Sequence, residues 1–131
     1  MSNAIISAAL AVRLNTLGVP THWQNTDYNP PADTIYLAES LIPASVNPMG
    51  LAASSSESYE GIYQVLVYAP SGATKGGAYD AADSVIGHFP KALELTRDSI
   101  TVTILRAEQN GAFVSGDRFV VPVSIYYRAM V

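Results

Sequence analysis

The sequence predicts an α+β domain, a two-layer sandwich in which two helices pack on one face of a mostly antiparallel sheet of about four to five strands. Two observations predict this class. Apolar residues recur every three or four positions in segments 4–17 and 78–89, which is the period of a helix face. Segments 34–42, 61–69, 100–107 and 118–128 instead alternate between two faces, as strands do. The expected order is α-β-β-α-β-β, in one domain covering residues 1–131.

The first helix is expected to begin after Ser2 or Asn3, because their side-chain oxygens can accept the unpaired N–H groups of a first turn. Gly18 is suited to end this helix. The buried stripe is predicted to consist of Ile6, Leu10, Leu14 and Leu17. Residues 21–33 have little periodicity, so we expect a connector that crosses the body and is held by Trp23.

The strand at residues 34–42, whose apolar face is interrupted by Glu39, leads into the least regular part of the chain. Segment 43–60 contains two prolines, one glycine and five serines. A structureless connection longer than about 12–15 residues is usually either functional or disordered. Two interpretations stay open: a disordered serine loop, or an arm at 44–60 that becomes ordered against a neighbouring subunit. The second would use the apolar residues near the tip, which are Val46, Met49 and Leu51.

Residues 61–90 read as a strand, a glycine loop and a helix, an arrangement that phosphate-binding enzymes also use. The buried face of this helix is predicted to be Tyr79, Ala82, Ile86 and Phe89. The loop departs from the Walker A pattern, because Lys75 precedes the glycine pair instead of following it. Asp80 and Asp83 in the first turns of the helix would also repel a phosphate. We therefore predict that this stretch is scaffolding, a central strand with a covering helix.

The last third of the chain is predicted to hold two long strands and one further short edge strand at residues 92–95. Turn signals around Gly111 and Gly116 bound the segment between the strands at 100–107 and 118–128. Pro122 has no N–H to donate, so it marks the last strand as an edge, or as a strand that exposes that side.

The composition is apolar for a chain of this length, with 49% hydrophobic and only 14% charged residues. Charged residues usually make up about a quarter of a soluble domain, so we expect some apolar surface to meet other chains. The net charge is −4 and the seven basic residues are scattered, which argues against specific nucleic-acid binding. No apolar run approaches the roughly 18 residues of a membrane-spanning helix, and no cysteine supports disulfide or thiolate chemistry.

The residue patterns predict no catalytic residue, no metal site and no cofactor. His22 and His88 lack metal-ligand spacing, and there is no cysteine to complete a zinc site. The position of His88 at a helix end is explained by the helix dipole. The acid pairs at 57 and 60 and at 80 and 83 lack the dense spacing of a calcium loop, and no serine lies in a G-x-S-x-G motif. Eight tyrosines suit either strands or interfaces, and both interpretations stay open.

The order of motifs along the whole chain resembles one known family. A helix IISAALAVRLNTL at 5–17 precedes WQNTDYNPPADTIYL at 23–37, and a serine-rich arm precedes GIYQVLVYAP at 61–70. A helix then ends in HFP at 88–90, and the chain closes with GDRFVVPVSIYYR at 116–128. This pattern resembles the phage tail terminator-like family, small proteins of long-tailed phages and prophages related to the lambda-type tail terminator. The order and spacing of the motifs carry the resemblance, because no single motif is chemically diagnostic.

The resemblance implies a structural virion protein at the head-proximal end of the tail, assembled in the host cytoplasm. Such proteins are α/β sandwiches that close into a ring of six, stop the addition of tail-tube subunits and offer a surface for head-tail joining. The implied partners are further copies of the chain, the major tail tube protein and a head-completion or stopper protein. Neither a catalytic residue nor a cofactor, metal, membrane or nucleic acid is implied.

We expect subunit or partner contacts from the arm and from the edge of the last strand, namely Val46, Met49, Leu51, Tyr59, Arg118, Tyr126 and Arg128. Two alternatives to a terminator stay open. One is another neck, head-tail joining or minor tail component. The other is a small ligand-binding or hydrolytic α+β domain, with a pocket near residues 71–77 that uses His88 or His22.

Overall fold

The computed structural model describes residues 2–24, 34–48, 57–70, 75–116 and 118–130. Its elements in chain order are α1 (Ser2–Asn15), β1 (Thr21–His22), β2 (Tyr36–Pro48), β3 (Glu57–Pro70), α2 (Lys75–His88), β4 (Glu94–Arg97), β5 (Ile100–Gln109), β6 (Phe113–Ser115) and β7 (Arg118–Met130). Helix α1 ends near the predicted place, where Gly18 adopts a φ of +82° that glycine tolerates without a steric cost.

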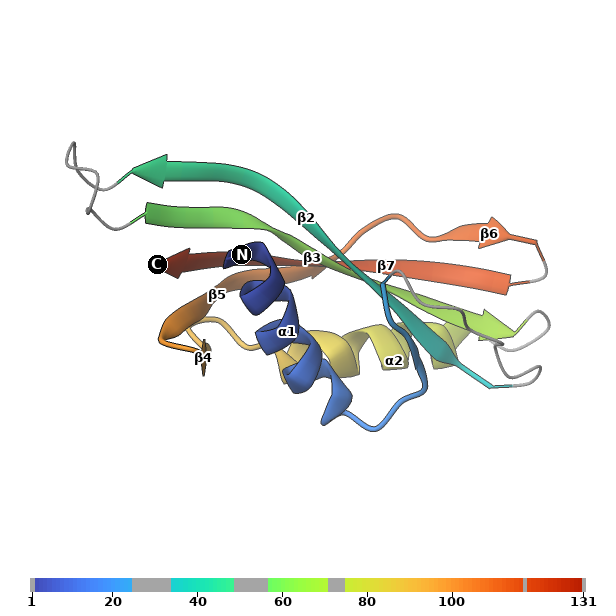
Figure 1. Cartoon of the computed structure of the whole chain (residues 1–131). Coiled ribbons are helices and arrows are strands. Elements are labelled where there is room, and N and C mark those ends of the chain that lie inside the picture. Colours follow the sequence, from blue (N-terminus) through green and yellow to red (C-terminus); the bar gives the residue numbers. More distant parts are fainter. Residues whose placement is uncertain (1, 25–33, 49–56, 71–74, 117, 131) are drawn as a thin grey trace.

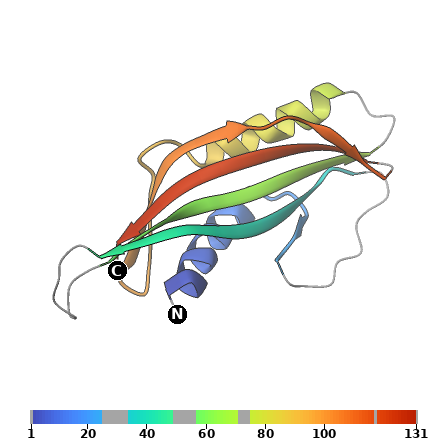
Figure 2. The same ribbon diagram turned by 90° about the horizontal axis from the view of Figure 1, so that it is seen from above.

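The strands form one seven-stranded sheet in the order β1-β2-β3-β7-β5-β4, with β6 paired to β7 outside this path. The short β1 runs parallel to β2, and the other pairs are antiparallel. The sheet curls into a half-barrel, and both helices lie on the same side of it (Figure 1). Seen from above, β2, β3, β7 and β5 run side by side, with both helices beneath them (Figure 2).

The predicted fold class, an α+β sandwich with four to five strands, is wrong. More than half of the described residues lie in strands, and the sheet has seven of them. One reason is length: β1 and β6 have only two and three residues, too few to show an alternating pattern. The other is that β2 and β3 continue into the segment that the prolines marked as irregular.

The described part of the predicted arm is a paired hairpin. Val46 lies opposite Tyr59, and Pro48 lies opposite Glu57. The register shifts between Pro43 and Ser45, which is a β-bulge. Prolines fit here because β1 covers β2 only at residues 37 and 38, and an edge strand needs no donor on its outer side. Met49, Leu51 and the rest of segment 49–56 lie outside the described residues.

Of the two alternatives predicted for Pro122, an edge strand is wrong, because β7 lies between β3 and β5. The carbonyl oxygen of Pro122 accepts a hydrogen bond of 2.9 Å from the N–H of Asn110. That side of Pro122 therefore faces the place where β5 has ended at Gln109 and β6 has not yet begun at Phe113. The missing N–H of proline falls at a gap between two partner strands, so the strand stays central.

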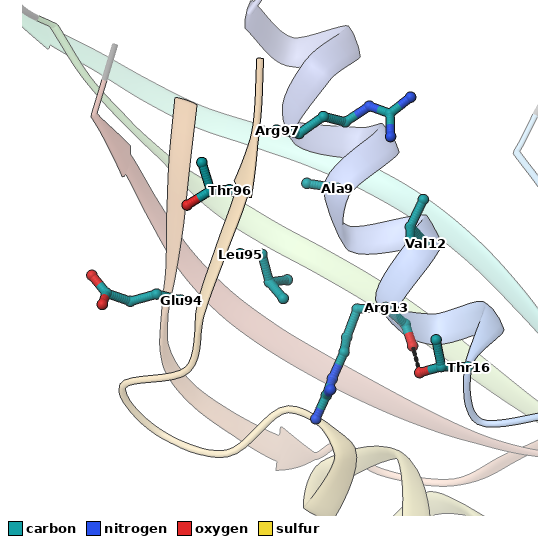
Figure 3. A pocket seen from close by; sticks show the side chains of 8 residues that line it. All are labelled: Ala9, Val12, Arg13, Thr16, Glu94, Leu95, Thr96 and Arg97. Atoms are coloured by element: carbon teal, nitrogen blue, oxygen red, sulfur yellow. Dashed lines mark hydrogen bonds between the residues drawn. The ribbon is translucent and has the colours of Figure 1, made fainter. Parts of the chain in front are cut away.

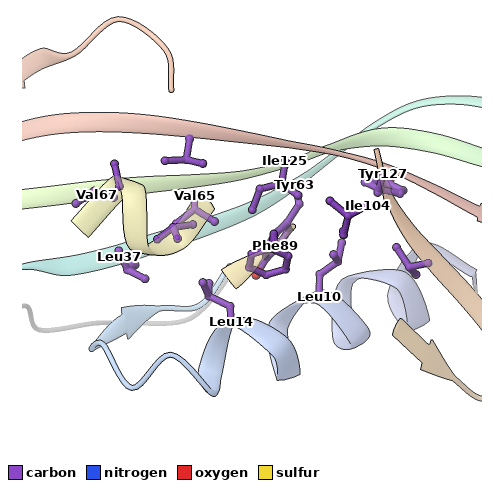
Figure 4. Packing of buried hydrophobic residues seen from close by; sticks show 14 of the residues in the cluster. Leu10, Leu14, Leu37, Tyr63, Val65, Val67, Phe89, Ile104, Ile125 and Tyr127 are labelled. Atoms are coloured by element: carbon purple, nitrogen blue, oxygen red, sulfur yellow. The ribbon is translucent and has the colours of Figure 1, made fainter. Parts of the chain in front are cut away.

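Alternate residues of the central strands and one stripe of each helix form the core (Figure 4). From α1 come Ile6, Leu10 and Leu14, as predicted. From α2 come Ala78, Ala82 and Val85, and Phe89 follows the helix. The predicted face of α2 was partly wrong, because Tyr79 is 36% exposed and Ile86 is only half-buried. The largest buried side chains include Tyr63 and Tyr127 from the sheet.

No helix in the described part of the chain is long and apolar enough to span a membrane.

Candidate functional site

His88, one of the two histidines considered for catalysis, joins the C-terminal ends of the two helices. Its Nε2 lies 2.8 Å from the carbonyl oxygen of Arg13 and 2.6 Å from Thr16 Oγ1. Arg13 Nε in turn donates a hydrogen bond of 2.9 Å to the carbonyl oxygen of His88. Arg13 thus caps the carbonyl of His88. His88 Nε2 joins the N–H and the hydroxyl of Thr16, which already donate to the Arg13 carbonyl. This reciprocal pair gives His88 a structural task beyond the dipole effect expected from the sequence.

Glu39 is a buried carboxyl group, and the sequence indicated only that it interrupts an apolar face. Its side chain in β2 points to the core side and is 7% exposed. Its Oε2 accepts a hydrogen bond of 3.3 Å from the N–H of Gln24, and Gln24 Oε1 accepts one of 3.0 Å from the N–H of Leu41. Burial raises the pKa of Glu39, and the hydrogen bond from Gln24 partly opposes that effect. The two side chains fasten the segment after β1 to the outer edge of β2.

Tyr63 lies beside this carboxyl group in the core. Its hydroxyl is buried and coupled electrostatically to Glu39, but it forms no well-aligned hydrogen bond. Burial, with a smaller effect of the Glu39 charge, raises the pKa of Tyr63, so the hydroxyl stays protonated. The ring is held against Phe89, with centroids 6.1 Å apart.

A cleft of about 320 Å³ borders this cluster, lined by His22, Trp23, Gln24, Ala38, Glu39, Ser40, Leu66 and Tyr68. A carboxyl group with a raised pKa near a histidine is the kind of pair that acid–base catalysis uses. Here the carboxyl group of Glu39 already accepts a hydrogen bond from the backbone N–H of Gln24, in the segment that follows β1. Within the described ranges no three His, Asp or Glu side chains gather as a metal site would require. The arrangement supports a structural task for Glu39.

The glycine loop considered as a phosphate cradle lies largely outside the described residues, since the structure resumes at Lys75, where α2 begins. Asp80 and Asp83 are exposed on α2. The prediction that both lie in the first turns of the helix is wrong, because α2 already begins at Lys75 and its first turn holds no acidic residue. Asp83 Oδ1 accepts a hydrogen bond of 2.7 Å from Gln109 Nε2, which ties the helix to the end of β5. Because both carboxylates lie beyond the first turn, their charge is no structural argument against a phosphate at the helix N-terminus.

The predicted contact residues of the arm lie in the β2–β3 hairpin. Val46 is 45% exposed on β2, and its cross-strand neighbour Tyr59 is half-buried and packs against the core. Met49 and Leu51 fall in segment 49–56, outside the described residues. Val46 is therefore the one residue among these that the structure describes as an exposed apolar side chain.

The predicted contact residues of the last strand already have partners within the chain. Arg118 donates a hydrogen bond of 2.9 Å to the carbonyl oxygen of Thr34. The hydroxyl of Tyr126 donates one of 2.9 Å to Glu108. Arg128 lies 3.9 Å from Glu60 in an exposed ion pair. These contacts fix the side chains on the surface of the sheet, so any partner would meet them in this arrangement.

Sequence reasoning missed the most exposed large apolar side chains. Val114 on β6 is 72% exposed and Val12 on α1 is 56% exposed. Val12 could have been noticed, because it lies off the stripe of Ile6, Leu10 and Leu14. Val114 offered no such signal, because it follows a turn in a strand of only three residues.

Val12 borders a groove between α1 and β4 of about 280 Å³ (Figure 3). We call this the α1–β4 groove, and its lining residues are Ala9, Val12, Arg13, Thr16, Glu94, Leu95, Thr96 and Arg97. Its floor is apolar and its rim carries two arginines and one glutamate. Such a surface is suited to receive an apolar side chain from another molecule.

One family model and the solved structures match this chain. A family model described as phage tail terminator protein matches residues 5–127, nearly the whole chain. A solved structure aligns with a TM-score of 0.78 at 28% sequence identity, covering 98% of this chain and 96% of that chain. None of the curated proteins matches the chain.

Proposed function

Because the chain belongs to the phage tail terminator family of structural tail proteins, we propose that it caps the tail tube as a ring and ends tube polymerisation. The observation that carries this proposal is the family match over residues 5–127. This range includes residues of both helices and of all seven strands. The ring would lie at the head-proximal end of the tail and would have six subunits.

The surface of the subunit supports assembly with other chains. Large apolar side chains are exposed at sites that lie far apart in the sequence, including Val12, Val46 and Val114. Each would gain roughly 1.5–3 kcal/mol if it were fully buried by a partner. With charged residues at only 14% of the chain, such burial is a physical reason for a subunit of this composition to assemble.

The β2–β3 hairpin supports the proposed arm contact. It projects at the end of the sheet where the C-terminus lies, beyond the helices that cover the core (Figures 1 and 2). Arg118 lies at the start of β7, toward the opposite end of the sheet. Contacts from both ends of one subunit are what a head-to-tail ring needs, because each copy must present two different surfaces.

The remaining partners follow from the same proposal. One face of the ring would contact the last layer of the major tail tube protein, and the other would contact a head-completion or stopper protein. These contacts involve protein surfaces alone, without a cofactor. A role as another neck component would involve the same kind of subunit, but it would not stop tube growth.

Tube polymerisation in vitro tests the proposal. Purified tube protein of the same phage is allowed to polymerise with and without this protein, and tube lengths are measured by electron microscopy. We expect added protein to shorten the tubes in a concentration-dependent manner and to be found at one tube end. Unchanged tube lengths, with no protein bound at the ends, would contradict the terminator role and favour another neck component.

A further inference from the structure

We propose that neighbouring subunits meet head to tail, with an apolar patch around Val114 of one copy seated in the α1–β4 groove of the next. This inference rests on the proposed ring and adds the residues that would join its subunits. The patch, called the β6 patch, consists of Val114, Phe119 and Tyr79.

The β6 patch is continuous across three elements. Val114 lies directly opposite Phe119 in the β6–β7 pair, so the two side chains point to the same face of the sheet. The Phe119 ring packs edge-on against Tyr79 of α2, with centroids 6.0 Å apart. Val114 is 72% exposed, and Tyr79 is partly exposed on an amphipathic helix whose Ala78, Ala82 and Val85 face the core. The result is an apolar projection supported from beneath by two aromatic rings.

The α1–β4 groove has the matching chemistry. Ala9 and Leu95 form its apolar floor, and Val12 stands on its rim with more than half of its side chain exposed. In Figure 3, Ala9 and Leu95 point toward each other across the space between the helix and the strand. A volume of about 280 Å³ is ample for a valine side chain and part of its hairpin.

The charges around the two surfaces are complementary. Beside the β6 patch, α2 exposes Asp80 and Asp83, the latter one turn after Tyr79 and on the same face of the helix. The groove carries Arg13 and Arg97, with Glu94 as its single carboxylate. A negative patch meeting a groove of net positive charge would favour this pairing over contacts between two like surfaces.

The two surfaces lie at opposite ends of the subunit. In both views α1 and β4 lie toward the end with the C-terminus, whereas β6 and the start of β7 lie at the far end (Figures 1 and 2). A projection and a groove at different places on one subunit give a heterologous contact, which propagates from copy to copy and closes a ring if the rotation is right.

Cysteine cross-linking tests the contact directly, because the natural chain has no cysteine. The full chain carrying both Val12→Cys and Val114→Cys is assembled on tail tubes and treated with a short bismaleimide. We expect a ladder of covalent oligomers up to the full ring. Each single variant should give no ladder, and an equal mixture of the two should give dimers only. As a matched control, Asp80→Cys with Val114→Cys places both thiols beside the same patch and should give no ladder.

The outcomes separate this inference from the proposed function. A ring on the tube without cross-links between positions 12 and 114 would overturn the inference and leave the terminator role standing. Dimers from the Val114→Cys variant alone would also overturn it, because they would show that two patches meet each other. As a second variant, Val114→Ser should weaken subunit association by about tenfold per contact, with an unchanged thermal midpoint. Unchanged association would contradict the proposal.

Discussion

Gly61 in β3 has no room for a side chain. A Cβ atom at this position would lie 2.6 Å from Tyr127 Oη and 2.6 Å from the carbonyl oxygen of Ile42. Tyr127 is buried and pairs with Gly61 across the sheet, and the Ile42 backbone belongs to the neighbouring strand β2. The Ile42 carbonyl cannot move without disturbing the ladder, and the Tyr127 hydroxyl is enclosed in the core, so Gly61→Ala must strain the centre of the sheet.

The size of the effect follows from two opposing terms. Forcing an extra methyl group into a packed core costs about 1–3 kcal/mol. Replacing glycine returns roughly 0.5–1 kcal/mol, because alanine loses less conformational freedom on folding. We therefore expect Gly61→Ala to lower the free energy of unfolding by about 1–2 kcal/mol. For a chain of this length that corresponds to a fall in Tm of roughly 4–8 °C.

Urea denaturation followed by circular dichroism measures this change. Gly87→Ala is the matched control, because it makes the same chemical change at an exposed helical position with no atom within 4 Å of the new Cβ. It should raise stability by about 0.5–1 kcal/mol, as expected for an exposed helix. The comparison thus separates steric strain at position 61 from the general effect of replacing glycine.

The Tyr127 hydroxyl provides a second check on the same contact. It is buried without a hydrogen-bond partner, and burial raises its pKa. Tyr127→Phe should therefore be neutral or slightly stabilising, since an unsatisfied buried hydroxyl is unfavourable. It should also recover part of the loss in Gly61→Ala, giving a coupling energy of about 0.5–1 kcal/mol in a double-mutant cycle. Wild-type stability of Gly61→Ala, or no coupling, would refute this account of the contact.

Three further predictions concern the other sites. Glu39→Gln should flatten the pH dependence of stability. The pKa of Glu39 is higher in the folded state than its ordinary value of 4.5, so the protonated carboxyl group favours folding at pH values below 4.5. This contribution is lost as the pH rises through the pKa of the folded state. Urea midpoints at pH 4.5 and 7.5 check this. His88→Ala should lower the free energy of unfolding by about 1 kcal/mol in chemical denaturation, because it removes the contacts of the imidazole with Thr16 and the Arg13 carbonyl. Val46→Ser should leave the free energy of unfolding within about 0.5 kcal/mol but weaken ring formation on tubes, measured by sedimentation with tubes.

Each of the three has a result that would count against it. A parallel pH dependence for Glu39→Gln and the wild type would show that this carboxyl group is not penalised by burial. An unchanged midpoint for His88→Ala would mean that water replaces the cap without cost. Normal sedimentation of Val46→Ser with tubes would remove this part of the hairpin from the proposed contact.

Much of the core could be predicted from the sequence, because it depends on periodicity. The stripe of α1 could be predicted because leucine and isoleucine recur there at helical spacing. In α2 the pattern was ambiguous, because alanines occupy several faces. Ala78 and Val85 face the sheet instead of Tyr79 and Ile86, since small side chains let the helix approach closely.

The extent of the sheet could not be predicted, because it depends on neighbours that are distant in the sequence. Pro43 and Pro48 are typical of a loop, but they are tolerated on an edge strand whose outer side is largely unpaired. Pro122 is tolerated in a central strand because the gap between β5 and β6 lies beside it.

The candidate contact surfaces were even less accessible to sequence reasoning. The exposure of Val114 depends on how far β6 extends past its neighbours, and the groove at Val12 depends on where β4 lies against α1. Periodicity tells which residues can face the core, but it does not tell which surfaces are left uncovered after the elements have packed.

Electron cryomicroscopy of tails assembled with this protein tests the central proposal most directly. The measurement is the density at the head-proximal end of the tube, together with the number of copies found there. The account predicts a single closed ring that ends the tube, with the β6 patch of each subunit in the α1–β4 groove of the next. Tube ends that lack this protein, or copies distributed along the tube wall, would contradict it.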